Sequence, residues 1–167
     1  LLGLRSFLRE SGWFEQRQIA VPNLAELLDL VALGTVADVV QLDSNNRILV
    51  YQGLARIKKG LCRPGIKAIL QMTNRDAAKA KAADFGFVIG PRLNAAGRLD
   101  DMSCGIRCLL TEDYGQALKM AEDLNSLNNE RKEIEQGMRV EAEAAVNTLA
   151  ITEGELPNGI CVYEADW

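Results

Sequence analysis

The 167 residues include 48% hydrophobic and 25% charged residues, which is typical of a soluble globular protein with one core and room for part of another domain. The absence of histidine excludes histidine catalysis and histidine metal ligands within the chain. No apolar run reaches the roughly 18 residues of a membrane span, and no signal peptide is visible. Because the sequence does not start with Met and stops after an apolar run, we expect a piece of a longer protein.

The net charge of −4 is unevenly distributed. Residues 47–98 hold eleven Lys or Arg and two Asp or Glu, a net +9, whereas residues 101–167 hold five and fourteen, a net −9. A basic block inside an acidic chain indicates a face that binds a polyanion. A solvated helical surface would have the same composition.

The first third of the chain is predicted to be helical. Apolar spacing predicts a helix over residues 1–9, which Gly12 ends. Asn23 is a suitable N-cap, with Glu26 three residues later, for a second helix that we expect Gly34 to close.

Asp38 follows this second helix among small and apolar residues. A carboxylate in such a setting should be hydrogen-bonded, ion-paired or bound to a metal. A simple loop cap is the alternative. Asp43 or Ser44 then caps a further helix. Its predicted buried side consists of Ile48, Leu49, Tyr51, Leu54, Ala55 and Ile57.

Residues 58–89 alternate basic turns with apolar segments. We expect turns at residues 58–60 and 63–65, a short helix over residues 66–72 and a buried segment over residues 82–89. The aromatic residues Tyr51, Phe85 and Phe87 are predicted to be core. The cysteines at positions 62, 104, 108 and 161 are predicted to be buried, reduced thiols rather than zinc ligands.

Residues 90–101 form the most distinctive stretch, with the sequence Gly-Pro-Arg-Leu-Asn-Ala-Ala-Gly-Arg-Leu-Asp-Asp. We predict a loop, because its first two residues break an arriving helix. Gly97 allows close approach of a ligand or a positive φ. Arg92 and Arg98 are planar forks suited to phosphate. The alternative is an ordinary helix–loop–helix corner. In that case the two arginines cap carbonyls or pair with Asp100 and Asp101.

The remainder is predicted to be helical up to a final strand. A helix over residues 102–110 should turn Met102, Ile106, Leu109 and Leu110 inward. Apolar spacing without proline predicts one helix over residues 113–151, about 55 Å long, which connects two domains. Asn125, Asn128, Asn129 and Arg131 form a polar patch on it, or simply a solvated face. Residues 160–163 are predicted to be a strand.

Three stretches together resemble the RecJ family, single-strand-specific exonucleases of the Asp-His-His (DHH) phosphoesterase superfamily. They are residues 30–40 with Asn46 and Arg47 after them, residues 90–101, and residues 124–134. The likeness runs over nearly the whole chain, in the right order.

The resemblance implies an enzyme of DNA repair and recombination that degrades single-stranded DNA from its 5′ end with Mn²⁺ or Mg²⁺, in the cytoplasm. The family's other metal-binding motifs would lie upstream of this chain. Asp38 is therefore implied to be the one metal ligand and catalytic residue here, and the chain alone is expected to be inactive. The implied DNA contacts are Arg47, Arg92, Asn94 and Arg98.

The implied fold is mainly α. Residues 1–111 would be the C-terminal part of an α/β DHH catalytic domain, residues 112–152 a long connector helix, and residues 153–167 the start of a second, DHHA1-type domain with its first strand. Exposed core surface could support a dimer, and no membrane partner is expected. Two alternatives stay open: a DHH-family phosphodiesterase for short oligonucleotides or cyclic dinucleotides, and a non-catalytic helical module that binds nucleic acid or protein.

Overall fold

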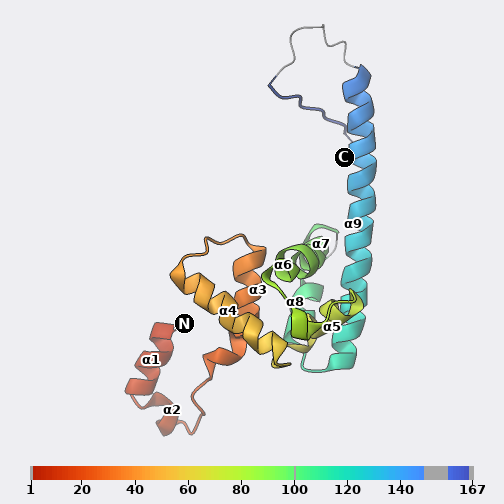
Figure 1. Ribbon diagram of the computed structural model, residues 1–167. Helices are drawn as coiled ribbons and strands as arrows, with labels where there is room; N and C mark the ends of the chain where they lie inside the picture. The colour runs from red at the N-terminus through yellow and green to blue at the C-terminus, as the bar shows by residue number, and fades with distance from the viewer. Residues whose placement is uncertain (1, 100, 149–157, 166–167) are drawn as a thin grey trace.

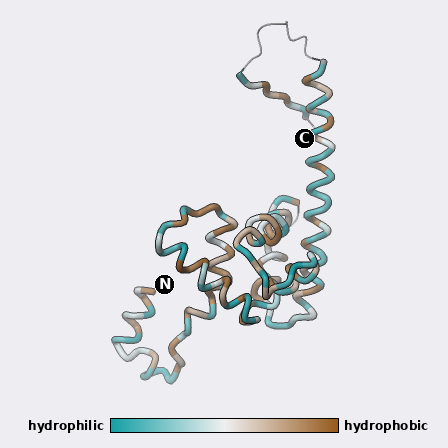
Figure 2. The backbone as a smooth tube through the Cα atoms, in the orientation of Figure 1, coloured by the Kyte–Doolittle hydropathy of each residue, from teal (hydrophilic) through white to brown (hydrophobic). Residues whose placement is uncertain are grey.

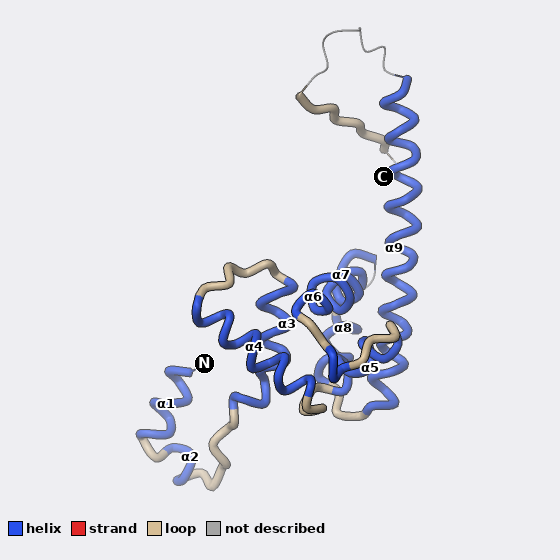
Figure 3. Tube along the Cα trace, viewed as in Figure 1, coloured by secondary structure: helices blue, strands red, loops and turns tan. Residues whose placement is uncertain are grey.

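The computed structural model describes residues 2–99, 101–148 and 158–165, which contain helices and no strand (Figures 1 and 3). The mainly α fold class is thereby confirmed for these residues. The helices are α1 Leu2–Glu10, α2 Trp13–Gln16, η1 Leu24–Leu27, α3 Leu28–Ala37, α4 Ser44–Lys58, α5 Pro64–Met72, η2 Ala77–Lys79, α6 Ala82–Asp84, η3 Phe85–Ile89, α7 Gly90–Leu99, α8 Ser103–Leu110 and α9 Tyr114–Thr148.

Local capping explains where several helices begin and end. Gly12 follows α1 with a φ of 71°, a conformation that glycine adopts without strain. The Asn23 side chain accepts a hydrogen bond from the N–H of Ala25 before η1, and Asp43 accepts one from the N–H of Asn46 at the start of α4. These caps were predicted from the sequence and are confirmed.

Helices α3 and α4 pack closely against each other. Gly53 makes this approach possible, because a Cβ there would collide with the carbonyl of Leu28 and the side chain of Ala32. The prediction that Gly34 closes the helix is wrong, since α3 continues to Ala37. A helical glycine costs only about 1 kcal/mol relative to alanine, which the burial of Ala32 and Leu33 outweighs.

The predicted buried face of α4 is partly wrong. Val50, Gly53 and Ile57 are its buried residues, whereas Ile48 is exposed and Tyr51 is 69% exposed. Phe87 is also exposed, so only Phe85 of the three predicted core aromatics is buried. The cysteine prediction needs a similar correction. Cys108 is buried, Cys62 and Cys104 are intermediate, and Cys161 is exposed.

The core lies where α5, η3, α7 and α8 meet the first half of α9 (Figure 1). Its largest fully buried apolar side chains are Phe85, Ile57, Ile66, Ile69, Leu70, Ile89 and Leu124. Figure 1 shows α1 and α2 apart from this body. Nε of Arg5, in α1, donates a hydrogen bond to the carbonyl of Pro22 at 2.8 Å.

Helix α9 is continuous for 35 residues, as predicted, which corresponds to about 52 Å. Its buried positions are Ala117, Ala121, Leu124 and Asn128, spaced by four, three and four residues. Beyond Asn128 the helix leaves the body, and this half is mainly hydrophilic in Figure 2. The long helix therefore has a packed half and a projecting half.

Residues 90–99 are helical, so the predicted loop is wrong. The π-helix η3 runs directly into α7, and Pro91 is the second residue of α7. A proline is tolerated in a first turn, and the change from π to α hydrogen bonding occurs there. Gly97 lies inside α7 beside Met102 and has no positive φ. Asp100 lies outside the described residues.

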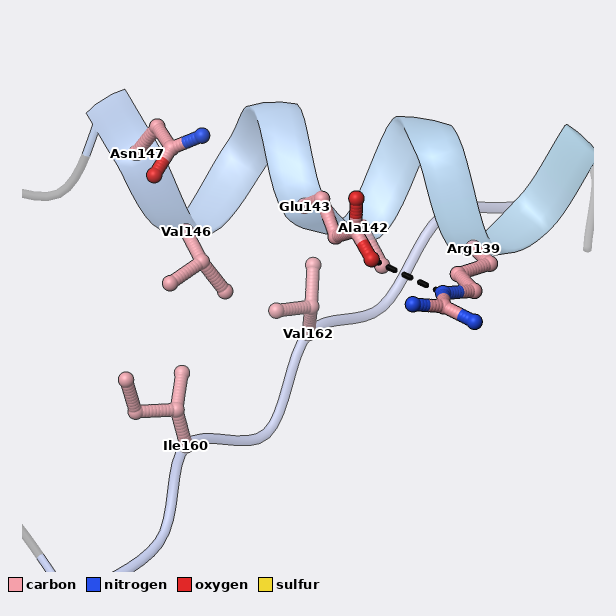
Figure 4. Close-up of a pocket in the computed structure, with 7 residues that line it drawn as sticks. All are labelled: Arg139, Ala142, Glu143, Val146, Asn147, Ile160 and Val162. Atoms are coloured by element: carbon pink, nitrogen blue, oxygen red, sulfur yellow. Dashed lines mark hydrogen bonds and ion pairs between the residues drawn. The ribbon is translucent and has the colours of Figure 1, made fainter.

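Residues 160–163 do not form the predicted strand. Ile160 and Val162 instead lie along the projecting half of α9, beside Ala142 and Val146 (Figure 4). A strand requires a backbone partner, and no strand is present among the described residues. The predicted start of a second domain at residue 153 falls on residues 149–157, outside the described part of the chain.

Candidate nucleic-acid interface

Asp38 is the C-cap of α3 and is exposed. Its backbone N–H donates to the carbonyl of Gly34 at 3.0 Å. The carboxylate lines a depression of about 340 Å³ between α3, α7 and α8, whose lining is apolar except for Asp38 and Asn94. A carboxylate with no ion-pair partner among the described residues can accept a ligand from solvent.

The outer face of α8 forms one wall of this depression. Met102, Ile106 and Leu110 were predicted to point into the core, but they are 41%, 52% and 59% exposed and line the depression. Cys108 and Gly105 are the buried residues of α8 instead. The apolar spacing was read correctly as a helix, but the side that faces the body was assigned incorrectly.

A second depression, of about 210 Å³, lies between α7 and α9. Pro91, Asn94, Arg98 and Arg131 line it, so Asn94 belongs to both depressions. The structure therefore brings three predicted site residues, Asp38, Asn94 and Arg98, to neighbouring positions around α7.

Arg92 has a different environment from Arg98. Its Nη1 donates to the carbonyl of Val88 at 2.7 Å, and its Nε and Nη2 donate to Oδ1 of Asn125 at 3.1 and 3.0 Å. Burial lowers the pKa of the Arg92 guanidinium below its ordinary value. Arg92 thus ties α7 to α9 in addition to any contact with a ligand.

Arg47 lies in the first turn of α4 and is exposed. Its N–H donates to the carbonyl of Asp43 at 3.0 Å. It lines neither of the two depressions described above. Among the predicted site residues, Arg47 is therefore the one that the structure does not bring to α7.

The oxygen atoms of Asp38 and Asn94 are of the type that Mn²⁺ and Mg²⁺ prefer. No group of three or more His, Cys, Asp or Glu side chains gathers in the described part of the chain. The residues present therefore fit one carboxylate ligand of a divalent ion and not a complete metal site.

Asn128 and Arg131 have more structured surroundings than a solvated face would provide. The Asn128 side chain is fully buried, and the Arg131 side chain is 20% exposed. The sequence contained a signal for this, because the apolar spacing of Ala117, Ala121 and Leu124 continues directly to Asn128. Of the two interpretations of this patch, the solvated face is wrong for Asn128 and Arg131 and holds for Asn129, which is exposed.

Comparison with known proteins adds independent information. The chain is 59% identical, over all 167 residues, to the single-stranded-DNA-specific exonuclease RecJ of Escherichia coli (strain K12). The chain belongs to the RecJ family. It spans 29% of the length of that relative. RecJ of Haemophilus influenzae is 51% identical over the same residues, and RecJ of Bacillus subtilis is 34% identical over 142 residues, which is 85% of this chain and 17% of that protein.

The fold of this RecJ-family chain resembles that of solved RecJ structures over three quarters of its length. The crystal structure of RecJ in complex with Mg²⁺ from Thermus thermophilus matches with a TM-score of 0.63 and 36% identity, over 75% of this chain and 19% of that one. A crystal structure of exonuclease RecJ bound to manganese matches with the same TM-score and identity, over 75% of this chain and 31% of that one. No family model matches the chain. None of the described helices has the length and apolar character needed to cross a membrane.

Proposed function

We propose that this chain is part of a 5′→3′ exonuclease that hydrolyses the phosphodiester bonds of single-stranded DNA with Mn²⁺ or Mg²⁺, in DNA repair and recombination in the cytoplasm. The observation that carries the proposal is the position of Asp38 and Asn94 on one depression, with Arg98 beside it. The exonuclease name of the relatives supports it and favours it over a cyclic-dinucleotide phosphodiesterase or a purely binding module.

Each site residue has a role in this proposal. Asp38 is a metal ligand, Asn94 and Arg98 contact DNA phosphates next to it, and Arg47 and Arg92 extend the contact along the basic block. Catalysis by two close divalent ions needs several carboxylates, because each ion requires oxygen ligands and compensating charge. Asp38 alone does not meet this need, so this chain by itself is inactive.

The domain boundaries are also a proposal. Residues 1–111 belong to the catalytic domain, residues 112–152 form the connector, and residues 153–167 begin the next domain. The packing of α3 to α8 as one body supports the first domain, and the departure of α9 from this body beyond Asn128 supports a connector whose first half packs on that domain. Dimerisation through exposed core surface is a further prediction, which size-exclusion chromatography with light scattering tests.

Substitution of Asp38 in the intact protein that contains this chain tests the metal role. Asp38→Ala abolishes Mn²⁺-dependent cleavage of single-stranded DNA and leaves binding largely intact, because a metal ligand is lost while the basic contacts remain. Asp43→Asn is the matched control, since asparagine caps α4 as well as aspartate does. Cleavage retained in Asp38→Ala rejects the assignment.

Substitution of Arg98 tests the DNA contact. Arg98→Ala weakens binding of single-stranded DNA and lowers the salt slope, d(log K)/d(log[salt]), by about 0.7, because one phosphate contact is lost. Arg139→Ala, on the projecting half of α9, is the control and keeps the wild-type slope. An unchanged slope in Arg98→Ala would mean that this arginine is an ordinary surface residue.

A further inference from the structure

The buried face of α9 ends in two polar residues whose N–H groups are not all paired. Asn128 is fully buried and Arg131 is mostly buried, one turn further along the helix. Nδ2 of Asn128 and Nε of Arg131 are buried atoms without a hydrogen-bond partner among the described residues. A buried donor without an acceptor costs about 1–3 kcal/mol, so two of them on adjacent turns require a physical reason.

Rotating the Asn128 amide does not remove the problem. Oδ1 of Asn128 accepts a hydrogen bond from Nη2 of Arg131 at 3.4 Å. The flipped amide would direct N–H groups at a guanidinium, which has donors and no acceptor. Arg131 Nη1 also pairs with Glu135. These two partners hold the Arg131 guanidinium in place.

Arg131 also lines the α7–α9 depression, together with Arg98, Asn94 and Pro91. Arg98 is exposed, and no described residue accepts a hydrogen bond from its guanidinium. Two guanidinium groups from different helices therefore face one space, with Glu135 as the single carboxylate paired to either of them among the described residues. The volume of about 210 Å³ is several times the roughly 30 Å³ that one water occupies, so a phosphate group fits.

We propose that Arg131 and Arg98 bind one phosphate group of a nucleic-acid strand in this depression. The chemistry is that of planar forks around an oxyanion, with one guanidinium contributed by each of two helices. The inference rests on the proposed function, because it takes α7 as the face that meets DNA, and it adds a contact from the connector helix. Free phosphate has the same chemistry, so the test separates the two sources.

The test follows the arginine Nε–H signals of the ¹⁵N-labelled 167-residue chain by NMR. Three probes are titrated: inorganic phosphate, a short oligothymidine strand, and the same strand with a 5′-phosphate. The strands shift the Nε–H signals of Arg131 and Arg98 and leave that of Arg139 unchanged. Arg139 is a matched reference, because it pairs with Glu143 at the same four-residue spacing but is exposed (Figure 4).

Affinities of two variants complete the test. Arg131→Lys keeps the charge but loses Nε–H and the fork, and it binds the strand about tenfold more weakly or worse. Arg139→Lys binds as the wild type does. Equal affinity of the two variants, or an unshifted Arg131 signal in the wild-type chain, overturns the inference. If the inference fails in one of these two ways but Arg98→Ala still loses binding of the strand, the proposed function stands without the Arg131 contact. Shifts with inorganic phosphate alone overturn the assignment to a strand.

Discussion

The link between Arg92 and Asn125 gives a quantitative prediction about how α7 is held on α9. Oδ1 of Asn125 accepts two hydrogen bonds from Arg92, at 3.1 and 3.0 Å, and Arg92 donates a third to the carbonyl of Val88 at 2.7 Å. Asn125→Ala removes one acceptor and leaves two donors of a half-buried cation unpaired. Hydrogen bonds to charged groups contribute about 1.5–3 kcal/mol.

The two bonds share one oxygen and Arg92 keeps access to water, so the lower end of that range applies. We expect Asn125→Ala to reduce the free energy of unfolding by about 1.5–2 kcal/mol. Arg92→Ala also loses the Val88 bond and the packing of its stem, which raises the loss to about 2–3 kcal/mol. The double variant should lose no more than Arg92→Ala alone, because both substitutions remove the same interaction.

Urea unfolding followed by circular dichroism measures all four proteins of this cycle. Asn129→Ala, on the exposed side of the same helix, is the control and changes the free energy by about 0.5 kcal/mol or less. Losses in Arg92→Ala and Asn125→Ala that add within about 0.5 kcal/mol would refute the coupling. Arg92 would then be a surface cation available mainly for phosphate.

Three further substitutions or measurements test individual features. Asp29→Asn should destabilise the fold by about 1.5–3 kcal/mol in urea, because the buried Asp29 carboxylate accepts backbone N–H bonds at both oxygens and an amide cannot; wild-type stability would contradict this. Phe85→Ala should lower the free energy of unfolding by about 3–5 kcal/mol, because the Phe85 side chain is fully buried. Phe87→Ala should change this free energy little, because the Phe87 side chain is 83% exposed. Equal losses in the two variants would contradict this difference in burial. Burial raises the pKa of the Cys108 thiol from 9.0 to about 11. The protonated thiol therefore contributes stability that is fully present below pH 9.0 and is lost as the pH rises through about 11. In alkylation at pH 8 the exposed Cys161 should therefore react first, as mass spectrometry of the modified peptides would show, and faster labelling of Cys108 would refute the assignment.

Much of the secondary structure could be predicted from the sequence. The caps at Asn23 and Asp43 depend on short-range hydrogen bonds, and α9 depends on a regular spacing without proline, so both are local properties. The helix over residues 90–99 was missed because glycine and proline usually interrupt helices. Here the π-helix η3 carries the chain into Pro91, and that geometry depends on the packing of Phe85 and Ile89 in the core.

The side that a helix turns toward the body was harder to predict than the helix itself. Ile48 and Ile106 have the hydropathy of core residues but are exposed, because neighbouring small residues, Gly53 and Gly105, set the faces that pack. The same limit applied to the site. The type of residue identified Asp38, Asn94 and Arg98 as candidates, but only the packing of α9 against α7 placed Arg131 beside them.

The length of α9 has a mechanical consequence. Its packed half is fixed to α5, α7 and α8, and the projecting half, from Lys132 to Thr148, is about 25 Å long. A stiff rod of that length moves its far end by about 4 Å for each 10° of tilt at its base. The contact of Arg92 with Asn125 near that base therefore acts on the short arm of a lever. A sub-ångström shift of α7 is amplified several-fold where the helix ends.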